Sequence, residues 1–169
     1  MDTLFSIANL IAVFSAIGAA LLGLTTYRRQ KEIDIELKKG ELKRTAVTDY
    51  LSSIESLINH AVYSNDQSSS NEAAEILKCK KDLNKIYIYA PTRVVAAMDK
   101  LLSEAIVLAT IISKIPNAEI FEEDQVLRYS EKSNQVNEAY TNAVNIARKE
   151  IGLHTEKVGE VQLLLLGKF

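Results

Sequence analysis

Cysteine and histidine are scarce in this sequence, which has one cysteine, Cys79, and two histidines among 169 residues. A single cysteine excludes an intramolecular disulfide and a CxxC zinc knuckle, and two histidines argue against a histidine-rich metal site. The sequence also lacks a Gly-rich phosphate loop, a Walker motif, an HExxH motif, a nucleophile elbow and an EF-hand loop. Most enzyme classes with readable signatures are therefore excluded, and we expect no metal and no other cofactor.

Charge is nearly absent from the N-terminal part of the chain. The net charge is −2, from 20 Lys and Arg and 22 Asp and Glu, yet Asp2 is the only charged residue among the first 27. The near-neutral balance argues against a dedicated duplex-DNA-binding protein, which usually has a strongly basic face. Because the chain has only two prolines and six glycines, and no segment alternates with the period of a strand, it is predicted to be all-α.

The uncharged stretch covers residues 4–26, or 23 residues. As a helix it spans roughly 35 Å, which is enough to cross a bilayer once. A cleaved signal peptide needs basic residues before the apolar run, whereas here Arg28, Arg29 and Lys31 follow it. We therefore predict a retained transmembrane anchor over residues 1–27, with its N-terminus outside and residues 28–169 in the cytoplasm by the positive-inside rule. The three basic residues are candidates for contact with lipid headgroups.

Small residues gather on one face of this predicted helix. At 100° per residue, Asn9, Ala12, Ala16, Ala20 and Gly23 fall within about 80° of one another, opposite bulkier side chains. Small faces let membrane helices approach closely, and an amide in hydrocarbon needs a partner such as another helix or a water-filled lumen. This face is a candidate pore lining or packing seam, although Ala and Gly are also common in any membrane helix. Several copies must surround a pore, because one helix cannot enclose it.

The remaining chain reads as helix almost throughout. Residues 28–46 carry seven Lys and Arg against four acidic residues, and we predict a basic juxtamembrane stalk helix that continues the anchor and is weakened at Gly40. A solvated, salt-bridged helix explains the same pattern without a partner. Residues 47–169 are predicted to form a cytoplasmic helical bundle, with Tyr63 to Ser70 as its first break. Its helices are expected at about 47–62, 71–89, 91–114 and 121 or 122–151, followed by a short last helix to 166 or 167.

Burial is predicted from the spacing of apolar residues. The third helix is the most apolar and should be central, and Cys79 should be a buried small residue. Tyr87 and Tyr89 could stack on a nucleic acid, but aromatic residues on an amphipathic helix are more often core, so we expect them there. The run 161–166 is apolar on nearly every face, which predicts a subunit interface.

One short motif could carry chemistry. Arg148 precedes His154 with five residues between them, which matches R-x4-6-H, the motif of the HEPN superfamily. Histidine can move a proton near neutral pH and arginine can stabilise the charge that develops when RNA is cleaved through its 2′-OH. Gly152 can break the helix, so that both side chains point into one groove. Alternatively, Arg148 is a cation that favours the C-terminal dipole of its helix and His154 borders the next one.

The anchor, the basic stalk, the helical body and the R-x4-6-H motif together resemble the HEPN-containing membrane accessory proteins of type VI-B CRISPR systems. The resemblance implies a HEPN-like bundle and a homo-oligomeric pore in the bacterial inner membrane, which we expect to contain about six or more copies. It also implies a functional partnership with an RNA-guided, RNA-targeting effector in antiphage defence, with RNA as a candidate ligand. Arg148 and His154 would form a functional groove whose catalytic status is open. Two alternatives remain: a membrane-tethered, metal-independent HEPN ribonuclease, and a non-catalytic membrane-anchored scaffold or regulator.

Overall fold

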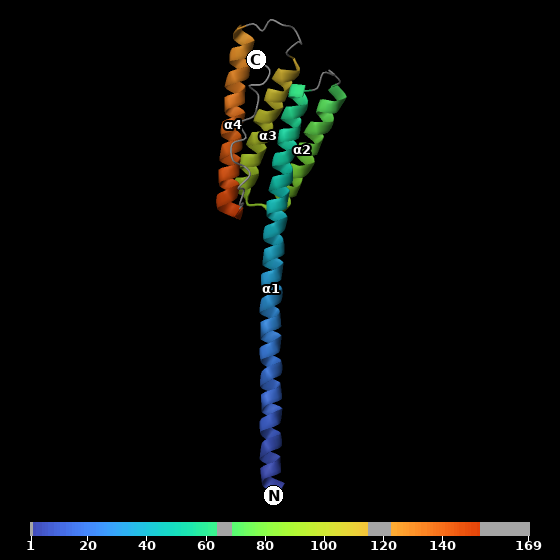
Figure 1. The fold of residues 1–169 in the computed structure, drawn as a ribbon, viewed down its shortest axis with the longest axis vertical. Helices are drawn as coiled ribbons and strands as arrows, with labels where there is room; N and C mark the ends of the chain where they lie inside the picture. The colour runs from blue at the N-terminus through green and yellow to red at the C-terminus, as the bar shows by residue number, and fades with distance from the viewer. Residues whose placement is uncertain (1, 64–68, 115–122, 153–169) are drawn as a thin grey trace. The chain divides into compact units, whose positions relative to one another are not determined.

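The computed structural model describes the backbone of residues 2–63, 69–114 and 123–152, and the side chains of residues 12–63, 71–114 and 124–152. These residues form four α-helices and contain no β-strand: α1 (Asp2–Tyr63), α2 (Ser69–Tyr89), α3 (Thr92–Ser113) and α4 (Glu123–Ile151) (Figure 1). The predicted all-α fold is confirmed, and the helices after α1 begin and end within two residues of the predicted positions. The predicted last helix and the apolar run 161–166 lie outside the described residues.

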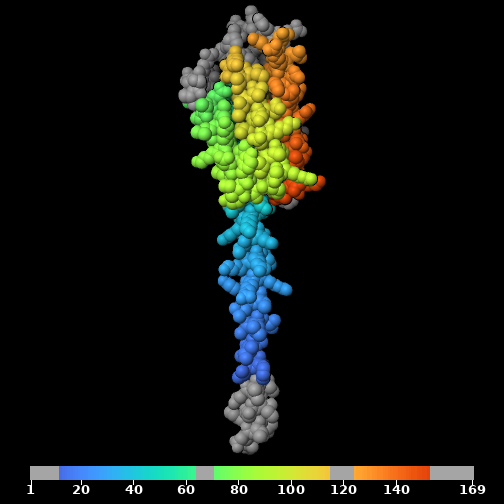
Figure 2. Space-filling model, turned by 180° about the vertical axis from the view of Figure 1, so that it is seen from behind, coloured from blue at the N-terminus to red at the C-terminus, as the bar shows by residue number. Residues whose placement is uncertain are grey.

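The chain divides into two compact units, Met1–Gly40 and Glu41–Phe169. The first unit is the N-terminal part of α1, which runs without a break from the uncharged stretch through the basic stretch, as the lack of proline and the scarcity of glycine predict. Figure 2 shows that the described side chains of this part of α1 project outward all along the helix. Among the residues that the structure describes, no helix has a stretch that is both long enough and apolar enough to cross a membrane.

The second unit is a helical bundle. It is formed by α1 from Glu41 onward together with α2, α3 and α4, and successive helices run in opposite directions (Figure 1). Pro91 sits in an extended conformation just before α3, where its missing N–H and fixed φ are tolerated. The α3 helix contributes nine buried residues to the core, which confirms its predicted central place.

The core begins at Ala46 and is built from the apolar positions that recur every three or four residues. On α1 the predicted positions are buried, with Ala61 partly so: Val47, Tyr50, Leu51, Ile54, Leu57, Ile58 and Val62. Cys79 is fully buried, as predicted. The prediction for Tyr87 and Tyr89 is wrong, because their side chains are 57% and 39% exposed. The core face of α2 is set by Cys79, Leu83 and Ile86, and rotation by 100° per residue carries both tyrosines off that face.

Candidate functional sites

Arg148, the first residue of the predicted motif, lies at the C-terminal end of α4. Arg148 is in the last turn of this helix and is exposed, while the preceding Ala147 is buried. The helix ends at Ile151, and Gly152 has φ 61°, the left-handed conformation that commonly terminates helices and favours glycine. The predicted break at Gly152 is thus confirmed. His154 lies outside the described residues, so Arg148 is the one member of the pair that the structure places.

One ion pair links the start of α3 to the end of α4. The Arg93 Nη1 atom lies 3.8 Å from Glu150 Oε1, two residues from Arg148, and the Arg93 side chain is 81% exposed. An ion pair this open to solvent contributes little to stability. The ion pair places Arg93 at the end of the bundle that also carries Arg148.

The predicted small face lies on the N-terminal part of α1. Asn9 is in this helix, with its side chain outside the described range, and Ala12, Ala16, Ala20 and Gly23 are exposed. A Cβ atom added at Gly18 or at Gly23 would meet nothing within 4 Å. Arg28, Arg29 and Lys31 are also exposed on α1.

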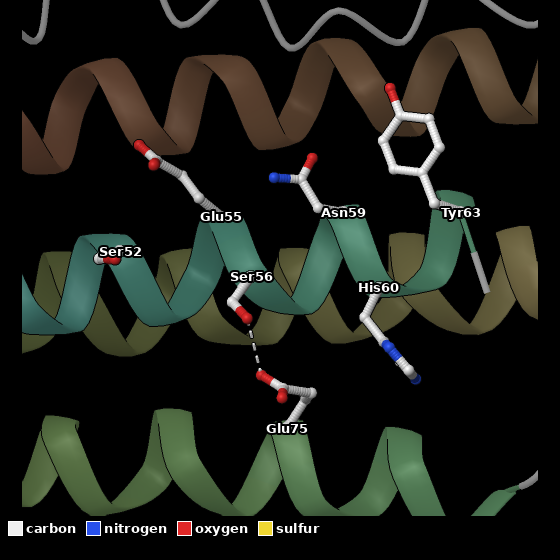
Figure 3. A pocket seen from close by; sticks show the side chains of 7 residues that line it. All are labelled: Ser52, Glu55, Ser56, Asn59, His60, Tyr63 and Glu75. Atoms are coloured by element: carbon white, nitrogen blue, oxygen red, sulfur yellow. Dashed lines mark hydrogen bonds between the residues drawn. The ribbon is translucent and has the colours of Figure 1, made fainter.

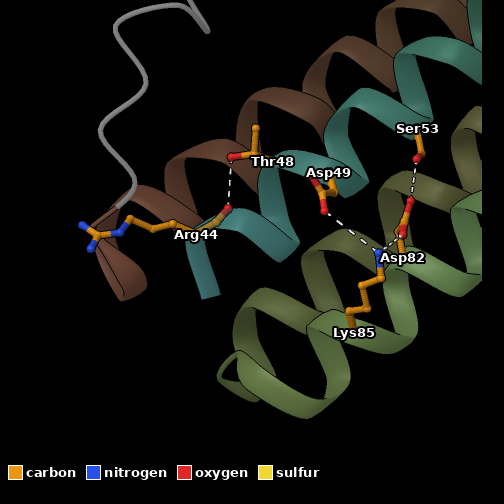
Figure 4. Close-up of polar contacts among 6 residues, drawn as sticks. All are labelled: Arg44, Thr48, Asp49, Ser53, Asp82 and Lys85. Carbon is orange, nitrogen blue, oxygen red and sulfur yellow. Dashed lines mark hydrogen bonds and ion pairs between the residues drawn. The ribbon is translucent and has the colours of Figure 1, made fainter. Parts of the chain in front are cut away.

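A buried polar contact joins α1 to α2 (Figure 4). The Ser53 hydroxyl donates a hydrogen bond of 2.6 Å to Asp82 Oδ2, and Lys85 Nζ donates one of 2.7 Å to Asp82 Oδ1. Asp49 Oδ2 lies 4.0 Å from the same Lys85 nitrogen. Both Ser53 and Asp82 are buried, so the carboxylate is satisfied by one hydroxyl and one ammonium group in the bundle.

The electrostatics of Asp82 follow from these partners. Burial by itself raises the pKa of this carboxyl group, but the hydrogen bonds from Lys85 and Ser53 and the nearby positive charge outweigh burial, and the net effect is a lowered pKa. The same hydrogen bond to Asp82 raises the pKa of Lys85. The pair is therefore ionised at neutral pH and acts as a structural tie.

Cys79 is held beside this contact. Its Sγ atom donates to the Ser53 carbonyl oxygen over 3.2 Å, and burial raises the pKa of its thiol to about 11. A thiol with so high a pKa is not a nucleophile at neutral pH, because the thiolate is the reactive form. The neighbouring Tyr50 donates from its phenol to the Met98 carbonyl oxygen over 2.7 Å, which ties α1 to α3.

A polar hollow of about 530 Å³ opens on the outer side of α1 (Figure 3). Six of its lining residues come from the last turns of α1 and the seventh from α2: Ser52, Glu55, Ser56, Asn59, His60, Tyr63 and Glu75. Tyr140 of α4 donates from its phenol to Glu55 Oε1 over 3.0 Å, and the Ser56 hydroxyl donates to Glu75 Oε2 over 3.0 Å. The two carboxylates are thus held in place from two sides of α1.

Sequence reasoning missed this hollow. Glu55 and Glu75 are twenty residues apart, on two helices, and no motif links them. The described residues contain no group of three or more His, Cys, Asp or Glu that could hold a metal ion. Comparison of the chain with protein-family models, with curated proteins and with solved structures found no match.

Proposed function

We propose that this chain is a single-pass protein of the bacterial inner membrane that assembles into a homo-oligomeric pore and carries a helical domain on the cytoplasmic side. By the resemblance to type VI-B CRISPR accessory proteins, the pore would compromise the membrane in support of an RNA-guided, RNA-targeting effector. The groove around Arg148 and His154 would be the functional region of the helical domain. The proposal rests on the uncharged run 4–26, of which the side chains of residues 4–11 lie outside the described range.

The observation that carries the proposal is a set of large apolar side chains on α1 that are exposed in the described part of the structure. Six such side chains between residues 13 and 24 are each more than half exposed: Val13, Phe14, Ile17, Leu21, Leu22 and Leu24. Exposed apolar surface of this density needs an apolar environment, because each fully buried side chain of this size gains about 1.5–3 kcal/mol over its exposed state. Lipid tails supply that environment for a helix.

The two faces of α1 support assembly rather than a lone anchor. At 100° per residue the six bulky residues lie on one side, and Ala12, Ala16, Ala20 and Gly23 lie on the other. A small-residue face lets helix backbones pack closely in a bilayer. Bulky apolar side chains do not by themselves cause helices to associate there, because lipid tails already surround them. Copies of the chain packed through this face, with the bulky face toward lipid, could surround a common axis.

The test compares two glycine substitutions in the same helix. Gly23→Leu places a bulky side chain on the small face, and Gly18→Leu places it 140° away, on the bulky side, with the same gain in apolarity. The full chain would be reconstituted in liposomes loaded with a self-quenched dye. We expect dye release from wild type and from Gly18→Leu, and at least about tenfold less from Gly23→Leu, because an interhelical packing loss near 1.4 kcal/mol is tenfold in an equilibrium constant. Equal release from the two variants would refute the packing seam.

A membrane-tethered ribonuclease is the second candidate, and the break at Gly152 favours it by ending the helix between Arg148 and His154. The discriminating experiment is cleavage of a labelled RNA by the full chain, by His154→Ala and by His60→Ala. The second variant is the matched control, because His60 lies near the end of α1 and has no arginine at the motif spacing. Cleavage that His154→Ala alone abolishes would establish the ribonuclease; no cleavage by wild type would leave the pore without enzymatic activity.

A further inference from the structure

The hollow on the outer side of α1 is lined by acidic and uncharged polar residues. None of its seven lining residues is Lys or Arg, and two of them, Glu55 and Glu75, are acidic. The other groups are two serine hydroxyls, an amide, an imidazole and a phenol. The lining therefore offers many hydrogen-bond acceptors and a formal charge of −2, which suits a positively charged ligand.

The two carboxylates are positioned before any ligand arrives. Tyr140 fixes Glu55 from α4, and Ser56 fixes Glu75 across the gap between α1 and α2. Among the described residues each of these bonds uses one carboxylate oxygen, and an ionised carboxylate can accept about four hydrogen bonds. A second oxygen on each Glu can thus accept from a ligand without breaking the bonds that hold the helices together.

The arrangement favours an organic cation over a metal ion. A metal ion needs several ligands converging on one point, and the described residues contain no such group. In Figure 3, Glu55 points toward α4 and Glu75 approaches α1 from α2, so the two carboxylates line different sides of the hollow. Tyr63 and His60 add two rings at the end of the hollow, where a cation can rest against an aromatic face.

We propose that this hollow binds a small organic polyammonium ion, with one ammonium group at Glu55 and another at Glu75. The hydroxyls of Ser52 and Ser56 and the amide of Asn59 line the space between them and accept or relay the remaining N–H bonds. A hollow of about 530 Å³ falls within the usual volume of small-molecule sites. The site lies wholly within the helical bundle, so it does not depend on the proposed pore.

The test is titration calorimetry of the full chain with spermidine at fixed ionic strength, with Mg²⁺ as the inorganic comparison. We expect saturable spermidine binding that Glu55→Gln and Glu75→Gln each weaken about fivefold, the upper range for a partly exposed ion pair. Glutamine keeps an acceptor for Tyr140 and for Ser56, so both variants should retain the fold. Glu72→Gln is the matched control, because it removes the same charge one turn earlier on α2 and does not line the hollow.

A steric variant separates a shaped site from simple charge attraction. Ser52 is exposed and lines the hollow, so Ser52→Leu fills space there without changing the charge or burying a polar group. We expect this variant to weaken spermidine binding about tenfold while its thermal unfolding stays unchanged. The proposal is overturned if wild type shows no saturable binding, if Mg²⁺ displaces spermidine at equal charge concentration, or if Glu72→Gln weakens binding as much as Glu75→Gln.

Discussion

Removal of the Asp82 carboxylate tests the polar contact between α1 and α2. Asp82→Ala leaves the Ser53 hydroxyl, in a residue only 2% exposed, without the acceptor that lies 2.6 Å away. A buried hydroxyl without a partner costs about 1–3 kcal/mol, whereas the Lys85 ammonium, whose side chain is 44% exposed, can be hydrated again. We expect the free energy of unfolding to fall by about 2 kcal/mol. Urea denaturation followed by far-UV circular dichroism would measure it.

A double variant tests whether the hydrogen bond between Ser53 and Asp82 accounts for this loss. Ser53→Ala together with Asp82→Ala removes donor and acceptor at once, so no buried group is left unsatisfied. The pair should be less destabilised than the sum of the two single variants by about 1 kcal/mol, as expected for residues in direct contact. Additive effects would show that the hydrogen bond does not hold the two helices together.

The same carboxylate predicts a pH dependence. Because the pKa of Asp82 is lowered in the folded state, folding stabilises the ionised carboxylate relative to the protonated one. This stabilisation is fully present above the unfolded pKa of about 3.9 and is lost as the pH falls through the lower folded pKa. The stability difference between wild type and Asp82→Asn should therefore shrink as the pH falls from 7 toward 3, and a difference that grew on acidification would contradict the assignment.

Three further predictions concern the described part of the bundle. Gly152→Ala should cost about 1 kcal/mol in urea denaturation, since a side chain there meets no neighbouring atom and only the left-handed backbone is penalised; no loss would show that the chain turns differently there. Cys79 should react with a thiol reagent at pH 7 only at the rate of unfolding, because it is buried and its thiol pKa is about 11; complete labelling of the folded protein within seconds would count against this burial. Arg93→Ala should change stability by less than about 0.5 kcal/mol, since its ion pair is exposed; a larger loss would mean that Arg93 makes a stronger contact.

The helices and the core could be predicted because they depend on local patterns. Apolar spacing placed the buried face of α1, Pro91 marked the start of α3 and Gly152 marked the end of α4. The burial of Tyr87 and Tyr89 was predicted wrongly because it was inferred from their aromatic side chains and not from their angular positions around the helix. Counting from Cys79 through Leu83 to Ile86 at spacings of four and three would have put them off the core face.

The polar sites could not be predicted because they depend on which helices become neighbours. Ser53 and Asp82 are 29 residues apart, and Glu55 and Tyr140 are 85 apart. Serine and glutamate on a helix usually face solvent, so nothing in the sequence distinguishes these residues from surface positions. Only the packing of α1 between α2 and α4 brings them together (Figure 3).

We propose that copies of this chain assemble through the N-terminal part of α1. The most direct test is the mass of the full chain in detergent, measured by light scattering with the micelle contribution subtracted, for wild type, Gly23→Leu and Gly18→Leu. We expect a discrete assembly of about six or more copies for wild type and Gly18→Leu, and a smaller species for Gly23→Leu. A wild-type monomer or dimer could not enclose a channel and would contradict the pore.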